Sequence, residues 1–316
     1  MKSVIKKILV LFILVFIFYL LFREAWFNWE KIKQYEFIFD YQNLLISYLI
    51  FFVNLILFSR VWHYTLKCIE PSAGITKYES FKVMVYARLG KYIPGKIWNF
   101  AGRIYLGSYY NTSKKALMIS SLLQTAVLVI SGIILGVSVI SLLLNPSYNF
   151  LYLLIFPVIG LIALLNPKYF YKIINLIIKK IGRKPITESY YLNKQQLLFL
   201  YLQTLLIQIL NGTAVFFMIR SFVEAPGNIW LGIVGITVFS NISGVLAVFS
   251  PGGIGVREGV LAFLLKFYYP ISLAVLISLL ARLWLVIGEG AATIIIFAFD
   301  KTVNHIIKNK QAKNIL

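Results

Sequence analysis

The chain has very few side chains that can hold a metal or close a disulfide. Cys68 is its one cysteine, and His63 and His305 are its two histidines, so neither an intrachain disulfide nor a Cys/His metal site can be assembled. Its 11 acidic residues are thinly spread and contain no paired-aspartate motif for a metal-bound diphosphate. No GxxxxGK[ST] sequence occurs, which excludes a nucleotide-binding P-loop. We therefore predict no metal site, no cofactor and no catalytic residue.

Charge is scarce as well, and this scarcity indicates the class of protein. Charged residues make up 13% of the chain and hydrophobic residues 60%, which is typical of a polytopic membrane protein and not of a soluble domain. The net charge of +20 does not indicate a nucleic-acid partner, because the 31 Lys and Arg fall in the gaps between apolar runs. The positive-inside rule accounts for them.

Apolar runs of about the length that crosses a bilayer, roughly 20 residues, follow one another along the chain. The first run is predicted to be a retained span, because FREAWFNW follows it without a signal-cleavage site. The polar segment 166–196 is predicted to be a loop, too small for a catalytic module. We expect one transmembrane domain over 1–316 and no soluble catalytic domain. The runs lie at 5–22, 38–58, 116–144, 149–165, 197–219, 229–249 and 271–299.

The distribution of basic residues predicts the orientation. Ten Lys and Arg lie between Arg60 and Lys115, and seven lie within 166–196, so both regions should be cytoplasmic. Both termini, each with several lysines, should also be cytoplasmic, in a multi-pass protein of the plasma membrane. Seven full crossings would separate the termini, so one run must not cross.

Two segments interrupted by proline and glycine are predicted to enter the membrane and return. SNISG at 240–244 and then SPGG interrupt the run 229–249, which should form a hairpin with 254–268 from the outer face. Pro-Gly interrupts 87–107, which should form a hairpin from the cytoplasmic face. The residues that break the helices are Pro94, Gly95, Pro251, Gly252, Gly253 and Gly255.

The predicted fold is all-α, with about six full spans and two oppositely oriented re-entrant hairpins, about eight segments by hydropathy. One span precedes each hairpin and one follows it. The segments 38–144 and 197–299 therefore form an inverted repeat, and in transporters such paired, broken segments mark a binding site near the midplane.

Arg257 and Glu258 follow the second break. If a half-helix begins near Val256, its free N–H groups and positive dipole end suit an anion such as phosphate, and Arg257 adds a bidentate donor. The alternative is a surface loop whose arginine contacts lipid headgroups. The buried site is favoured, because Glu258 would gain nothing from anionic lipid.

Arg282 and Glu289 lie seven residues apart in the last run, hence on one helix face. A charge near the bilayer centre costs at least ~2.5 kcal/mol, so Arg282 needs compensation. We predict one interior network of Arg257, Glu258, Arg282 and Glu289. A static ion pair that only holds two helices together fits the spacing equally well.

In the first hairpin, Lys96 and Arg103 follow the break and are predicted to face the cavity opposite Arg257. Positive-inside bias and interfacial aromatic residues account for most of the residues around them. These are Arg88, Lys91, Tyr92, Trp98 and Tyr105.

Three polar residues lie inside apolar runs, where hydrogen bonding between helices is their expected role. They are Asn211, Asn241 and Ser243.

Two stretches, YIPGKIWNFAGR (92–103) and SPGGIGVREG (250–259), resemble the signature regions of the lysylphosphatidylglycerol synthase transmembrane family. This flippase-like domain occurs alone or fused to a soluble aminoacyltransferase domain. The resemblance implies an eight-segment membrane domain that moves or holds a phosphate-bearing lipid, which is aminoacylated phosphatidylglycerol in the fused proteins. We expect no aminoacyltransferase domain after the membrane part, which would argue against a synthase. The matching positions are Pro94, Gly95, Lys96, Trp98, Arg103, Pro251, Gly252, Gly253, Gly255, Arg257 and Glu258.

The leading hypothesis is a flippase-like protein for an aminoacylated phospholipid or a polyprenyl-phosphate-linked sugar, with anionic membrane lipids as partners. One alternative is a non-transporting subunit whose basic loops recruit a cytoplasmic synthase or glycosyltransferase. The other is an intramembrane lipid-linked transferase, which the sparse acidic residues disfavour. No nucleic-acid partner is expected, and the sequence leaves the oligomeric state open.

Overall fold

The computed structural model describes residues 37–92, 97–144, 167–180, 185–247 and 253–313, with Arg23 and Ser250, and every regular element within them is helical. The predicted spans 5–22 and 149–165 lie outside the described residues. The α-helices are α3 (Tyr41–Ile69), α4 (Lys77–Leu89), α5 (Ile97–Gly107), α6 (Lys114–Leu144), α8 (Pro167–Lys180), α9 (Lys194–Arg220), α10 (Trp230–Leu246), α11 (Val256–Leu265) and α12 (Ile271–Lys313). Short 3-10 helices are η1 (Gly90–Tyr92), η2 (Ser108–Tyr110), η4 (Glu188–Tyr190) and η5 (Gly227–Ile229).

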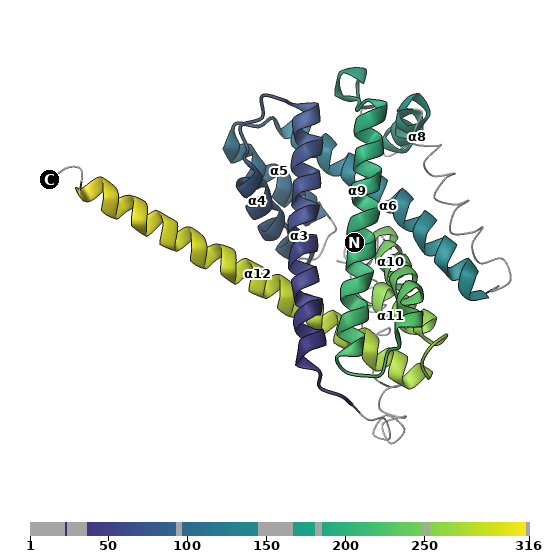
Figure 1. Cartoon of the computed structure of the whole chain (residues 1–316). Helices are drawn as coiled ribbons and strands as arrows, with labels where there is room; N and C mark the ends of the chain where they lie inside the picture. The colour runs from purple at the N-terminus through teal and green to yellow at the C-terminus, as the bar shows by residue number, and fades with distance from the viewer. Residues whose placement is uncertain are drawn as a thin grey trace, which may run out of the picture.

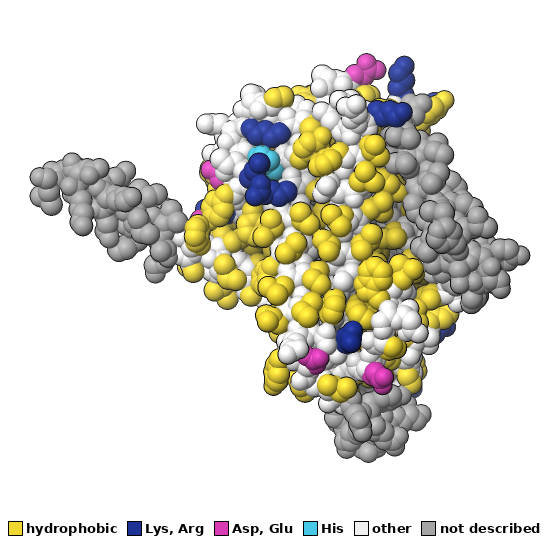
Figure 2. Space-filling model, in the orientation of Figure 1, with side chains coloured by type: hydrophobic (Ala, Val, Ile, Leu, Met, Phe, Trp, Pro, Cys, Tyr) yellow, Lys and Arg dark blue, Asp and Glu magenta, His cyan; other side chains and the backbone are white. Residues whose placement is uncertain are grey.

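Five of these helices, α3, α6, α9, α10 and α12, are long and apolar enough to cross a membrane. Figure 2 shows a broad band of hydrophobic side chains across the visible face, with charged side chains mainly toward its two ends. An apolar surface of this extent is stable against lipid and not against water. The prediction of an all-α polytopic membrane protein is confirmed. Exposed residues on α3 and α9 include Leu45, Leu49, Val53, Ile56, Phe199, Leu202 and Leu206.

Helices α3 and α9 lie antiparallel, side by side, at the centre of the bundle (Figure 1). The backbone N–H of Ile38, just before α3, donates to the carbonyl of Phe222, just after α9, at 3.0 Å. Farther along, the Ser47 hydroxyl donates to the Ala214 carbonyl at 2.8 Å, and the Asn54 amide donates to the Ile207 carbonyl at 2.6 Å. These bonds fix how α3 and α9 are aligned along their length. If one helix slid along the other, each donor would lose its carbonyl partner.

Asp40 determines where α3 begins. Its carboxylate accepts the backbone N–H groups of Gln42 and Asn43 at 2.9 and 3.1 Å, which are donors that the first turn leaves without partners. The bond from the Asn43 N–H lowers the pKa of Asp40, because it favours the ionised carboxylate.

The helix contacts have a two-fold pattern. Helix α4 pairs with α5 as α10 pairs with α11, and α6 packs against α10 as α12 packs against α4. Likewise α5 contacts α6 as α11 contacts α12. Exchanging the set α3–α6 with the set α9–α12 preserves these contacts. This is the contact pattern that the predicted inverted repeat would produce, because α3 and α9 are antiparallel.

The hairpins differ in extent from the sequence prediction. The first begins at Lys77 and not near residue 87, because the polar first turn of α4 hides this helix from a hydropathy scan. The predicted interruption at 240–244 is wrong, since α10 continues unbroken to Leu246. The Ser243 hydroxyl donates to the Phe239 carbonyl within the helix at 2.9 Å, so polar side chains in this stretch are satisfied without a break.

The prediction that 166–196 is only a loop is also wrong. It contains α8, which buries Phe170 and Tyr171 and carries lysines on its other side. The Tyr171 ring stacks on Tyr191 at 3.7 Å between centroids, and its hydroxyl accepts the backbone N–H of Leu192 at 2.8 Å. A short amphipathic helix therefore packs on the bundle where the net polarity of the segment suggested no structure.

Candidate functional site

The break before α11 depends on two glycines in a backbone conformation that other residues resist. Gly253 has φ +72° and Gly255 has φ +84°. The chain at Gly253 also passes very close to α10, since a Cβ added there would lie 2.8 Å from the Gly244 Cα. The remaining predicted breakers, Pro94, Gly95, Pro251 and Gly252, lie outside the described residues.

Replacing Gly253 by Ala should lower the free energy of unfolding by about 2 kcal/mol or more, because the positive φ alone costs ~1–2 kcal/mol and the Cβ would also strike the α10 backbone. Gly259→Ala is the matched control, since a Cβ at this α11 position meets nothing within 4 Å. Thermal unfolding in detergent compares the two variants. Equal melting temperatures would contradict the assigned role of Gly253.

The Glu258 side chain caps the amino end of its own helix, α11. Its carboxylate accepts the Gly255 N–H at 2.6 Å and lies 3.4 Å from the guanidinium of Arg282 on α12. Within the predicted network of four residues, Glu258 therefore pairs with Arg282. Because Glu258 already occupies an N–H group at the helix end, an anion in this region depends on side-chain donors more than the sequence suggested.

Glu289 on α12 binds the first hairpin. The Lys91 ammonium lies 2.5 Å from its carboxylate, the Arg88 guanidinium lies 3.5 Å away, and the Tyr92 hydroxyl donates to it at 2.7 Å. The Arg282 guanidinium lies 5.5 Å from the centre of the Tyr92 ring, a cation–π contact. The predicted network therefore consists of two carboxylate clusters, around Glu258 and Glu289, that meet at Tyr92.

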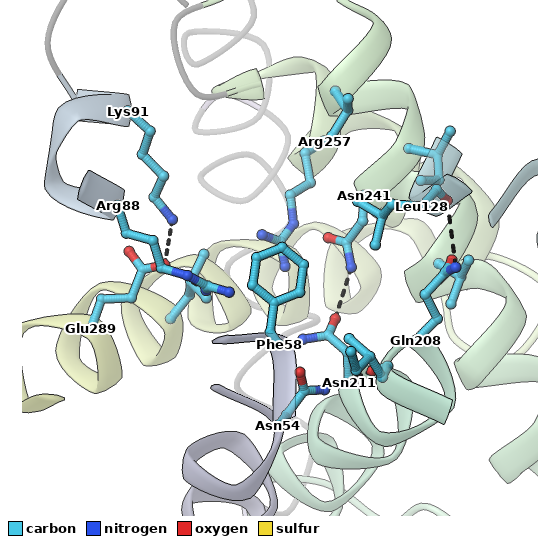
Figure 3. Close-up of a pocket in the computed structure, with 15 residues that line it drawn as sticks. Asn54, Phe58, Arg88, Lys91, Leu128, Gln208, Asn211, Asn241, Arg257 and Glu289 are labelled. Atoms are coloured by element: carbon cyan, nitrogen blue, oxygen red, sulfur yellow. Dashed lines mark hydrogen bonds and ion pairs between the residues drawn. The ribbon is translucent and has the colours of Figure 1, made fainter. Parts of the chain in front are cut away.

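A cavity of about 190 Å³ lies among the helices beside the Glu289 cluster. Figure 3 shows Arg88, Lys91 and Glu289 on one side of it and a group of amide side chains on the other. Helices of both sets, α3–α6 and α9–α12, contribute to its wall. Its lining comprises Asn54, Phe58, Arg88, Lys91, Leu128, Ile207, Gln208, Asn211, Val238, Asn241, Ile242, Val245, Arg257, Leu285 and Glu289.

Arg257 reaches from the first turn of α11 into this cavity (Figure 3). Lys91 and Arg88 share Glu289, and Arg282 pairs with Glu258, but no carboxylate of the described residues forms an ion pair with Arg257. Of the four residues in the predicted network, Arg282 and Glu258 form an ion pair. Glu289 and Arg257 line the same cavity but do not form a direct ion pair. The Arg257 guanidinium is a cation beside an open volume.

The other side of the cavity is neutral and polar. The Asn241 amide on α10 donates to the Asn211 amide oxygen on α9 at 2.8 Å, which confirms the predicted bond between helices. The Gln208 amide donates to the Ser131 hydroxyl at 2.6 Å, and Asn54 completes the group from α3. These four amides surround the end of the cavity that faces away from Glu289 (Figure 3).

Arg103 lies outside the cavity lining but close to it. It is 5% exposed, donates to the Gln124 amide oxygen at 3.2 Å, and lies 5.6 Å from the Phe58 ring centre. Arg88 contacts the same ring at 4.9 Å, so Phe58 packs against both guanidinium groups. Lys96, the other predicted residue of this hairpin, lies outside the described residues.

Sequence reasoning assigned Arg88 and Lys91 to positive-inside bias and did not select Asn54 or Gln208. Sequence spacing could not identify these residues, because their partners are far away along the chain. Lys91, for example, binds Glu289, almost two hundred residues further on. An amide inside an apolar run was the one available signal, and it applied to Asn54 and Gln208 as much as to Asn211.

The fold and the cavity define a polytopic α-helical membrane protein whose helices border a half-open cavity, with three cationic and four amide side chains among apolar ones. The sequence signature described as the lysylphosphatidylglycerol synthase TM region matches residues 5–288, and the chain belongs to this family. The resemblance carried by the two glycine-rich motifs is therefore confirmed. No curated protein and no solved structure gives a match.

Proposed function

We propose that the protein binds the phosphate of an anionic membrane lipid in the central cavity and lets that headgroup pass between the leaflets. The observation that carries this proposal is the guanidinium of Arg257, which lines the cavity without an ion-pair partner in the described structure. A buried charge is stable only when it is compensated. A phosphate oxyanion is the natural bidentate partner of arginine.

The remaining charges of the cavity favour the same ligand. Three cations, Arg88, Lys91 and Arg257, line it with one carboxylate, Glu289, so the lining has an excess of positive charge. Glu289 also receives the Tyr92 hydroxyl, which further occupies its oxygens. A lipid supplies a phosphate from the surrounding bilayer while its acyl chains stay in the hydrocarbon, so no soluble entry path is needed.

The helix lengths support re-entrant hairpins. At 1.5 Å per residue, α5 and α11 are only roughly 15–17 Å long, about half of the hydrocarbon thickness. Each packs on its longer partner, α4 or α10, within a hairpin. Two half-length helices from opposite faces would bring Lys91 and Arg257 to one depth, where the cavity joins them.

We place the basic end of the bundle in the cytoplasm and the protein in the plasma membrane. The end that contains the α3 carboxyl terminus carries Arg60 and Lys67, and the α4 start adds Lys77. The opposite end carries Asp40 and Glu224 together with Arg220, so it has fewer cations than the first. This asymmetry follows the positive-inside rule. The predicted cytoplasmic N-terminus lies outside the described residues.

The transport test is a proteoliposome assay with fluorescent phosphatidylglycerol and a membrane-impermeant quencher. Flipping should expose inner-leaflet label at a rate that scales with the amount of protein, and labelled phosphatidylcholine should flip more slowly. Retention of phosphatidylglycerol without flipping would favour a subunit that holds lipid for a cytoplasmic synthase or glycosyltransferase. If the protein neither flips nor retains phosphatidylglycerol, the proposal is overturned.

A further inference from the structure

Helix α8 is fixed to the bundle by one of its faces. Phe170 and Tyr171 are buried there, and the Asn175 amide oxygen accepts the backbone N–H of Ile186 at 2.8 Å. The Asn175 amide N–H donates to the Tyr191 hydroxyl at 3.0 Å. These contacts fix the rotation of α8 about its own axis, so its other faces cannot turn toward the bundle.

A second face of α8 is apolar and exposed. Tyr169, Ile173 and Leu176, the apolar stripe, follow one another at steps of four and three residues, which places them on one side of the helix. Their side chains are 63%, 56% and 60% exposed. A helix that met water on this side would carry polar residues there, because exposing large apolar side chains to water is unfavourable. The apolar stripe therefore needs an apolar environment that the described part of the chain does not provide.

A third face of α8 is basic. Lys168, Lys172 and Lys179, the lysine row, follow one another at steps of four and seven residues, so they share the side next to the apolar stripe. All three are exposed, and no carboxylate of the described residues forms an ion pair with them. A lysine row beside an apolar stripe is typical of helices that lie in the membrane–water interface, where one side meets acyl chains and the other meets headgroups.

The position of α8 agrees with an interfacial location. It lies beside the start of α9 and across the direction of that helix (Figure 1). The Tyr171 hydroxyl accepts the backbone N–H of Leu192, just before α9, and the Lys115 ammonium of α6 lies 4.5 Å from the centre of the Tyr190 ring. Helices α6 and α9 are long enough to cross a membrane, so their lysine-bearing ends mark the level at which the hydrocarbon stops. With 14 residues, α8 is itself too short to cross.

We propose that α8 lies in the headgroup layer as an anchor for anionic lipid, with the apolar stripe against acyl chains and the lysine row on lipid phosphates. A bilayer surface supplies hydrocarbon and anionic phosphate side by side, which is the order in which the two faces of α8 follow each other. None of these residues lines the central cavity, so the inference does not rest on the proposed passage of a headgroup.

The test places one fluorescent label on the apolar stripe. Cys68→Ser removes the one native cysteine, and Ile173→Cys then carries a nitrobenzoxadiazole label in the purified full chain, in vesicles of phosphatidylcholine and phosphatidylglycerol. The label should emit as it does in hydrocarbon, and phosphatidylcholine with a doxyl group on its acyl chain should quench it. Ser189→Cys is the matched control, because Ser189 is exposed in η4 near the same end of the bundle and should report water.

A second measurement tests the lysine row. Doxyl-labelled phosphatidylglycerol should be enriched about fivefold over doxyl-labelled phosphatidylcholine around the label at 173, since one basic side chain near an anionic surface has an effect of this size. Replacing all three lysines by Gln should remove this preference and leave the label in hydrocarbon. Lys266→Gln, on a different part of the bundle, should keep the preference. Melting temperatures verify the fold, and a lowered preference in Lys172→Gln provides the test if the triple variant does not fold.

Each result decides part of the inference. Water-like emission from the label at 173, with quenching by soluble iodide, would place the apolar stripe in water and overturn the anchor. Apolar emission without quenching by lipid would mean that protein covers the stripe, such as a second copy of the chain, and would overturn it as well. Quenching by both lipids without a preference would support the anchor and overturn the contact between the lysine row and anionic lipid.

Discussion

Arg257→Ala should lose at least tenfold in its retention of anionic lipid while the protein keeps its fold. A charge-assisted hydrogen bond contributes about 1.5–3 kcal/mol, and every 1.4 kcal/mol is tenfold in affinity. The fold should persist, because no carboxylate of the described residues pairs with Arg257 and its removal leaves no unpaired anion. Native mass spectrometry measures the retained lipid, and thermal unfolding in detergent measures the fold.

Lys266→Ala is the matched control for this variant. Lys266 caps the carboxyl end of the same helix, is exposed, and lies outside the cavity lining. It should retain wild-type lipid. Arg257→Lys should be intermediate, since an ammonium keeps the charge and loses the bidentate geometry. Unchanged retention in Arg257→Ala would remove the main support for the phosphate site, and a large fall in melting temperature would show that Arg257 is structural.

Glu289→Gln should lower the free energy of unfolding by about 3 kcal/mol. The carboxylate compensates Lys91 at 2.5 Å and Arg88 at 3.5 Å, and it is 3% exposed. Removing one partner of a buried ion pair leaves the other charge uncompensated, which is strongly destabilising. Because the partners lie on the first hairpin and Glu289 lies on α12, the variant should also loosen the contact between α12 and that hairpin. Reversible unfolding in mixed detergent measures the change.

The chain offers a close control for Glu289→Gln. Asp300, farther along α12, pairs with Lys82 of α4 at the same 2.5 Å, but both side chains are partly exposed. Asp300→Asn should therefore cost less than about 1 kcal/mol. Added phosphatidylglycerol should stabilise Glu289→Gln more than wild type, since a phosphate can replace the lost negative charge. Equal losses in the two variants would show that burial of the Glu289 pair contributes little.

The periodicity and composition predicted some elements and missed others for identifiable reasons. The Gly-rich break before α11 was found, because Gly253 and Gly255 need a positive φ that glycine favours. Helix α8 was missed, since its lysines outweigh its buried Phe170 and Tyr171 in a hydropathy average. The break at 240–244 was wrongly placed. Polar side chains inside an apolar helix can form hydrogen bonds with a neighbouring helix, as Asn241 does with Asn211, so the helix need not end there.

The sequence by itself determined the class, the approximate bounds of the long apolar helices that the structure describes, the Gly-rich break before α11 and the charges that a membrane interior must compensate. Only the tertiary structure decided which charge compensates which. Glu289 on α12 meets Lys91 of the first hairpin, Glu258 meets Arg282 and the end of its own helix, and Arg257 remains beside the cavity. The physical reason is that composition and hydropathy are properties of neighbouring residues in the sequence. Ion pairs and cavities depend instead on how helices that are distant in the sequence pack together.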